Sequence, residues 1–117
     1  MVISFKYDLK GLKELEQMIK SADKKIQDRV NKAIKKVAWI ITSEVKKGTP
    51  VDTGRLRRSI HPIIKHLFAD IFTNVEYGIY VEDGTKYMKG VHMFKNVADK
   101  FGKQIPQMVL NEIKKAI

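Results

Sequence analysis

Residues 26–45 read IQDRVNKAIKKVAWIITSEV, and the spacing of their apolar side chains sets the fold class. Over the longer segment 9–47, apolar residues return every three or four positions, the repeat of a helix with one buried face. These positions are Leu12, Leu15, Ile19, Ala22, Ile26, Val30, Ala33, Val37, Ile41 and Val45. The pattern predicts a long N-terminal helical region over 9–47, with a kink or break near Ser21, where Ser21 and Asp23 offer a new cap.

The apolar stripe widens towards the end of this region, where Ala38, Trp39 and Ile40 join it. A helix that is apolar on most of its circumference has to be covered on most sides. The cover is expected to come either from the protein's own core or from a neighbouring subunit. Gly48 and Pro50 then predict the end of the helix, because glycine adopts the left-handed conformation easily and proline cannot continue a helix.

Two regions carry strand patterns. Residues 2–7 alternate between apolar and polar side chains, which predicts a strand with one apolar face. Residues 56–74 predict a β-hairpin with strands at 59–64 and 69–73. Pro62 favours an edge position for the first of these strands, because proline donates no ladder hydrogen bond. The tripeptide Asp52-Thr53-Gly54 before the hairpin predicts a turn.

The last third of the chain begins with an irregular stretch over 75–93 that contains three glycines. We expect a short helical or extended piece at 76–82, followed by a mobile loop over 84–92 that orders only against a partner. Residues 94–116 predict a C-terminal helix that Pro106 kinks or restarts.

The predicted fold class is therefore α+β, in one domain over 1–117. A long N-terminal helical region and a C-terminal helix pack on a small antiparallel sheet that contains a β-hairpin. The predicted core is built around Ile26, Val30, Ile34, Val37 and Ile41, which share one helix face.

Composition narrows the classes of function. The 117 residues carry a net charge of +10 and no cysteine, so disulfides and thiolate chemistry are excluded. The first residues lack the apolar core of a signal peptide, and we expect a soluble protein made in a cytoplasm. The positive charge has two interpretations, a nucleic-acid partner or a solvated lysine-rich helix face, and the interleaving of lysines with acids favours the second.

No catalytic motif accompanies the polar residues. His61, His66 and Asp70 lack metal-ligand spacing, and the two histidines, five residues apart, would point to opposite faces of a strand. Glu76, Glu82 and Asp83 are candidates for acid–base chemistry, but no P-loop, GxSxG or GxGxxG pattern is present. We expect no enzyme activity, no cofactor and no metal site.

Three of the four arginines lie in the segment Arg55-Leu56-Arg57-Arg58, the best nucleic-acid candidate in the chain. No sequence signature of a known nucleic-acid-binding module accompanies them. The favoured interpretation places these arginines at a strand start, where they pair with acids of a neighbouring subunit. A basic nucleic-acid-binding module remains the alternative function.

Two segments resemble a known family. Residues 49–60, TPVDTGRLRRSI, resemble the PVDTGxLRxSI segment of the small tail-component proteins of long-tailed bacteriophages, also described as tail-completion or head–tail joining proteins. Residues 74–85, NVEYGIYVEDGT, resemble the family's second signature, NxxYAxYVExGT. The order of helix, first motif, hairpin, second motif and C-terminal helix also matches. The sequence departs from the family pattern at Asp83, and at Met93, where the family commonly has proline.

The resemblance implies a structural phage or prophage protein of the virion, assembled in the host bacterial cytoplasm. It implies ring-like self-assembly at the head–tail junction, next to connector and tail-tube proteins, with no membrane partner and possible non-specific contact with DNA. Intersubunit or head–tail contacts are expected from residues of the two motifs. These are Pro50, Asp52, Thr53, Gly54, Arg55, Arg57, Tyr77, Tyr80, Glu82, Gly84 and Thr85.

Overall fold

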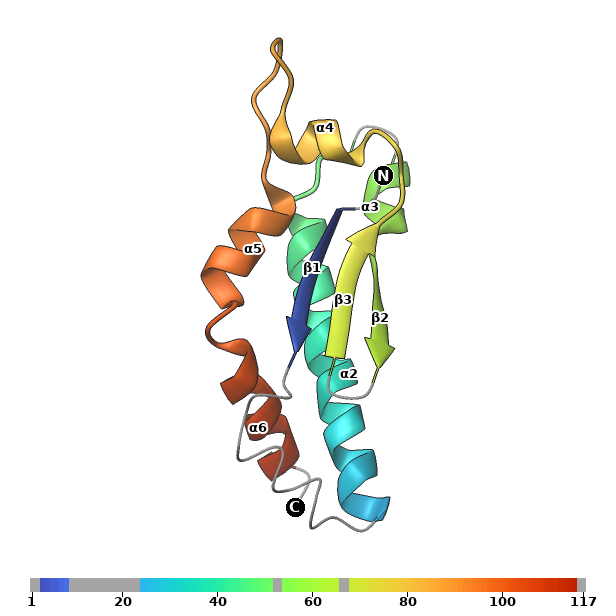
Figure 1. The fold of residues 1–117 in the computed structure, drawn as a ribbon, viewed down its shortest axis with the longest axis vertical. Helices are drawn as coiled ribbons and strands as arrows, with labels where there is room; N and C mark the ends of the chain where they lie inside the picture. Colours follow the sequence, from blue (N-terminus) through green and yellow to red (C-terminus); the bar gives the residue numbers. More distant parts are fainter. Residues whose placement is uncertain (1–2, 9–23, 52–53, 66–67, 116–117) are drawn as a thin grey trace.

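The computed structural model describes residues 3–8, 24–51, 54–65 and 68–115, and it has the predicted α+β fold (Figure 1). A long helix lies behind a small sheet, and two shorter helices run alongside both. The elements in chain order are β1 (Ile3–Asp8), α2 (Lys24–Lys47), α3 (Arg55–Ser59), β2 (His61–Lys65), β3 (Phe68–Thr73), α4 (Gly78–Asp83), α5 (Met93–Phe101) and α6 (Ile105–Lys115).

The sheet is antiparallel with the strand order β1-β3-β2. The hairpin strands β2 and β3 pair directly, and β1 joins the free side of β3, with Phe5 opposite Ile71. Pro62 therefore lies on an edge strand, as predicted, where a residue without a backbone N–H is tolerated.

The core lies between α2, the sheet and the two C-terminal helices. Val30, Ile34, Val37 and Ile41 are at most 1% exposed, and Ile26 is partly buried at the margin of the same cluster. The helix phase drawn from the apolar spacing is thus confirmed. Residues 9–23, where the kink near Ser21 was predicted, lie outside the described residues.

The helix ends lie where the glycine and proline signals predicted them, although Gly48 does not adopt the left-handed conformation, since among the described glycines only Gly54 and Gly84 have a positive φ. α2 stops at Lys47, the Gly48 N–H donates to the Val45 carbonyl, and the Thr49 hydroxyl caps that same carbonyl at 2.8 Å. The C-terminal helix is divided into α5 and α6. Pro106 is the second residue of α6, where a backbone N–H has no intrahelical partner to lose.

The predicted start of the first hairpin strand was wrong by two residues. Residues 55–59 form the short helix α3, so the strand begins at His61 and not at residue 59. The Ser59 hydroxyl donates to the Leu56 carbonyl at 2.6 Å and closes this turn locally. None of the helices in the described ranges combines the length and hydropathy needed to cross a membrane.

Candidate assembly surface

The two family-like motifs meet at one end of the molecule, through α3 and the start of α4. Arg55 and Glu76, 21 residues apart, form a two-point ion pair with both N–O distances at 3.2 Å. The Arg55 guanidinium also lies 5.5 Å from the centre of the Tyr77 ring. Both charged side chains are more than half exposed, so the pair orients the two motifs without being buried between them.

The pKa of Glu76 is held below its ordinary value. The largest cause is a hydrogen bond from its own backbone N–H, and the hydrogen bond and positive charge of Arg55 add to it. Glu76 is therefore ionised at neutral pH, and its charge is matched within the chain by Arg55.

Arg57 is committed to the protein's own backbone. Its Nε–H donates to the Lys46 carbonyl at 2.9 Å, which fastens α3 to the last turn of α2. The prediction that the arginines lie at a strand start was wrong, because they lie on α3. Arg55 and Arg57 have polar partners within the chain, and their expected pairing with acids of a neighbouring subunit stays a prediction.

The turn before α3 depends on Gly54, which has φ of 76° and ψ of −8°. Gly54 is the last residue of the predicted Asp-Thr-Gly turn, and side chains with a Cβ resist this left-handed conformation. Asp52 and Thr53 themselves lie outside the described residues. Pro50 is exposed directly after the helix end.

Glu82 is a buried residue that caps a helix. Only 5% of it is exposed, and its carboxylate accepts the backbone N–H groups of Phe94 at 2.8 Å and Lys95 at 3.1 Å. These donors belong to the first turn of α5, which has no intrahelical acceptors for them. Charge reversal at Glu82 is therefore expected to destabilise the fold. A contact role for Glu82 in assembly stays a prediction.

The segment between α4 and α5 projects from the body of the molecule (Figure 1). It is closed at its base, where the N–H groups of Val91 and His92 donate to the carbonyls of Val81 and Glu82. Gly84 has φ of 84°, and the Thr85 hydroxyl accepts N–H groups at the tip of the turn. The loop was predicted from its glycines, and its mobility stays a prediction.

The two motif tyrosines differ in position. Tyr77 is partly buried against the core, and its ring also lies next to the Arg55 guanidinium. Tyr80 is 57% exposed, although its neighbours Val81 and Glu82 turn inwards. Of the two, Tyr80 is the one that leaves most of its surface in solvent.

The histidines considered as metal ligands are described only in part. His61 is satisfied locally, with its Nδ1 2.6 Å from the Ser59 carbonyl, and His66 lies outside the described residues. Glu82, Asp83 and His92 do bring ligand-type atoms within 4.8 Å of one another. However, both Glu82 oxygens already accept backbone N–H groups, so we assign Glu82 to the helix cap.

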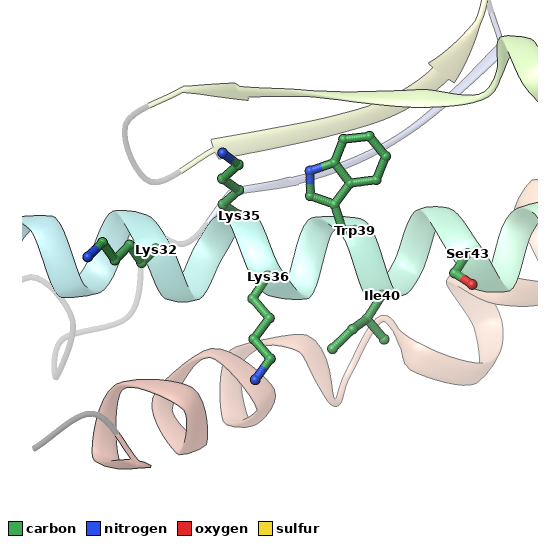
Figure 2. Close-up of a pocket in the computed structure, with 6 residues that line it drawn as sticks. All are labelled: Lys32, Lys35, Lys36, Trp39, Ile40 and Ser43. Carbon is green, nitrogen blue, oxygen red and sulfur yellow. The ribbon is translucent and has the colours of Figure 1, made fainter.

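A second surface lies on the outward side of α2. Trp39 and Ile40 are 48% and 37% exposed, whereas Ala38 beside them is fully buried. Figure 2 shows Trp39 projecting on the side of the sheet and Ile40 on the side of α6. They form a shallow hollow of about 520 Å³, which we call the α2 groove. Its lining is Lys32, Lys35, Lys36, Trp39, Ile40 and Ser43.

The α2 groove was not among the residues predicted for assembly. The widened apolar stripe did signal it, with the core and a neighbouring subunit as the two possible covers. In the structure Ala38 is buried in the core, whereas Trp39 and Ile40 are partly exposed in the single chain. The capping role of Glu82 had no local signal, because its partners lie 12 and 13 residues further along.

Comparison with known proteins identifies one family. The family model HK97-gp10_like, described as "Bacteriophage HK97-gp10, putative tail-component", matches residues 13–84. The match covers more than half of the chain and includes segment 49–60 and segment 74–85 up to Gly84. No curated protein and no solved structure shows a significant match to the chain.

Proposed function

Because the chain belongs to the HK97-gp10-like family of bacteriophage tail components, we propose that it completes the tail and joins it to the head by assembling into a ring. Its partners are further copies of itself and the neighbouring connector and tail-tube proteins. Its place is the head–tail junction of the virion, and it assembles in the host bacterial cytoplasm. We assign it a structural role without a catalytic step.

The observation that carries this proposal is the family match over 13–84, which contains the first motif segment and all but the last residue of the second. The fold supports it, because these segments are joined at one end of the molecule by the Arg55–Glu76 pair. The same end carries the exposed Tyr80 and the projecting loop with Tyr87, which is 83% exposed. Large exposed aromatic side chains are typical of protein contacts, since they bury much area at a small entropic cost.

The alternative, a nucleic-acid-binding module, has weaker support. Arg55 and Arg57 of the arginine cluster are held by Glu76 and by the Lys46 carbonyl. The lysines exposed along α2 are suited only to non-specific phosphate contact. DNA binding by the purified chain, titrated with salt, separates the two proposals. A nucleic-acid-binding module must bind DNA tightly, with an affinity that falls steeply as salt is added. A structural joint needs no such binding.

The decisive experiment is genetic complementation in the phage that encodes the chain. Deletion of the gene is expected to leave separate heads and tails that electron microscopy can count, and expression of the parent chain restores infectious particles. Purified particles should contain the chain in several copies at the junction, detectable by antibody labelling. Joined, infectious particles without the gene product would overturn the proposal.

A further inference from the structure

We propose that neighbouring copies meet by seating Tyr80 and Asp83 of one copy in the α2 groove of the next. Tyr80 and Asp83, which we call the α4 face, are three residues apart on α4 and therefore share one side of that helix. The inference rests on the proposed ring assembly and names the two surfaces that form its joint.

The α2 groove is the part of the long helix where apolar side chains stay partly exposed in the single chain. The opposite side of α2 is fully buried, but Trp39 and Ile40 keep 48% and 37% of their surface in water. Tryptophan is enriched among the residues that dominate binding energies at protein interfaces. A partner that buries these two side chains would supply the cover that the widened apolar stripe requires.

The rim of the groove selects the chemistry of its occupant. Lys32, Lys35 and Lys36 line it without any acidic residue among the lining side chains. Lys36 is paired with Glu112 at 2.9 Å, while Lys32 and Lys35 have no ion pair within the described residues. The occupant should therefore combine an apolar or aromatic side chain with a free carboxylate.

Charge excludes the most exposed aromatic residue as the occupant. Tyr87 and Met88 at the tip of the projecting loop are 83% and 59% exposed, but they lie between Lys86 and Lys89. Seating this tip on the lysine rim would bring like charges together, which opposes association.

The α4 face has the required chemistry. Tyr80 is 57% exposed, and the neighbouring Asp83 is exposed and has no ion pair within the described ranges. Tyrosine adds a hydroxyl that can remain at the polar rim while the ring packs on Trp39. Glu76, four residues before Tyr80, is already matched by Arg55, so Asp83 supplies the unmatched charge.

Such a contact joins two different patches, so it is heterologous. Each copy offers one groove and one α4 face, and repetition of the contact builds a ring when the rotation closes. The joint is therefore compatible with the proposed ring assembly.

The test uses the absence of cysteine from the chain. In particles complemented with the double variant Ile40→Cys/Tyr80→Cys, a short bis-maleimide reagent should give a ladder of covalent dimers, trimers and larger species. Each single variant offers only one of the two surfaces and should give no ladder. The matched control is Gln107→Cys/Tyr80→Cys, with its other cysteine on the exposed side of α6. Assembled particles in which the double variant stays monomeric would overturn the inference and leave the proposed function standing.

A charge exchange covers the case in which the cysteine variants do not assemble. Lys35→Asp and Asp83→Lys should each lower the number of infectious particles by at least about tenfold, the effect of a modest loss of contact energy. The double variant should recover most of the lost infectivity. Its two charges are exchanged between the surfaces, so they attract each other again. Normal titres from both single variants would overturn the inference, as would a double variant no better than either.

Discussion

The Glu82 carboxylate accepts the backbone N–H of Phe94 at 2.8 Å and so ties the end of α4 to the start of α5. The intervening loop can project from the body because this bond and the Glu82 carbonyl hold its base. A residue expected from its motif to serve a partner thus first serves the fold. It also sets the position of Tyr80 and Asp83, which lie on the same short helix.

Replacing Glu82 by alanine is expected to lower the free energy of unfolding by about 1–3 kcal/mol, because two helix N–H groups lose a charged acceptor. Glu82→Gln should lose less, since one amide oxygen still accepts. Urea denaturation followed by circular dichroism measures both. Asp83→Ala is the control, because that side chain is exposed, and it should stay within about 0.5 kcal/mol of the parent. Equal losses at the two positions would contradict the capping role.

Two glycines with positive φ should respond differently to alanine. At Gly54 the new Cβ would lie 2.7 Å from Nη1 of Arg58, a flexible side chain able to move aside. The expected loss is then the backbone strain alone, about 1 kcal/mol. At Gly84 the Cβ would meet the backbone of Gly90 and Met88, which cannot move without opening the loop.

Thermal unfolding should therefore rank Gly84→Ala as clearly more damaging than Gly54→Ala. Limited proteolysis should also cut the loop of the Gly84 variant faster than that of the parent, because opened loops are preferred sites of nicking. The reverse ranking would mean that the close approach of the two loop strands is not maintained in solution.

The phase of α2 is tested by placing a charge on either side of it. Val37→Asp and Ile41→Asp should each lower the free energy of unfolding by several kcal/mol, because both sites are 0% exposed and offer no partner for a carboxylate. Ser43→Asp, on the exposed side of the same helix, should change it by no more than about 0.5 kcal/mol. Chemical denaturation of the three variants gives the comparison.

The pKa of Glu112 should report the contact between α2 and α6. A hydrogen bond from Lys36 is the largest cause that lowers it below the ordinary value of 4.5, against an opposing effect of burial. Lys36→Met is expected to raise this pKa, measured by NMR titration of the carboxyl carbon. Lys35→Met, one residue earlier and without a bond to Glu112, is the control and should leave it in place.

The same interaction makes stability depend on pH in the acid range. Because the folded-state pKa of Glu112 is depressed, its contribution is present above the unfolded value near 4.5. It is lost as the pH falls below that value through the folded-state pKa. The difference in stability between the parent and Lys36→Met should therefore shrink on acidification from pH 6 to below pH 4.

The elements that depend on local spacing could be predicted from the sequence. The apolar period of α2, its end at Gly48, the edge position of Pro62 and the restart at Pro106 follow from the geometry of single elements. Helix α3 could not be predicted, because Arg55–Ser59 has no apolar period of its own. It depends on the left-handed Gly54 and on the bond from Arg57 to the Lys46 carbonyl.

The roles of the motif side chains could not be predicted either, because they also depend on contacts between distant segments. Arg55 and Glu76 are 21 residues apart, and Glu82 and Phe94 are 12 apart, so only the packed chain brings each pair together. Sequence by itself determined the α+β class, the buried face of α2 and the family, because these depend on periodicity and on short motifs. Tertiary structure decided which charged residues are used inside the fold and left Trp39, Ile40 and Tyr80 exposed, because burial depends on contacts between distant segments.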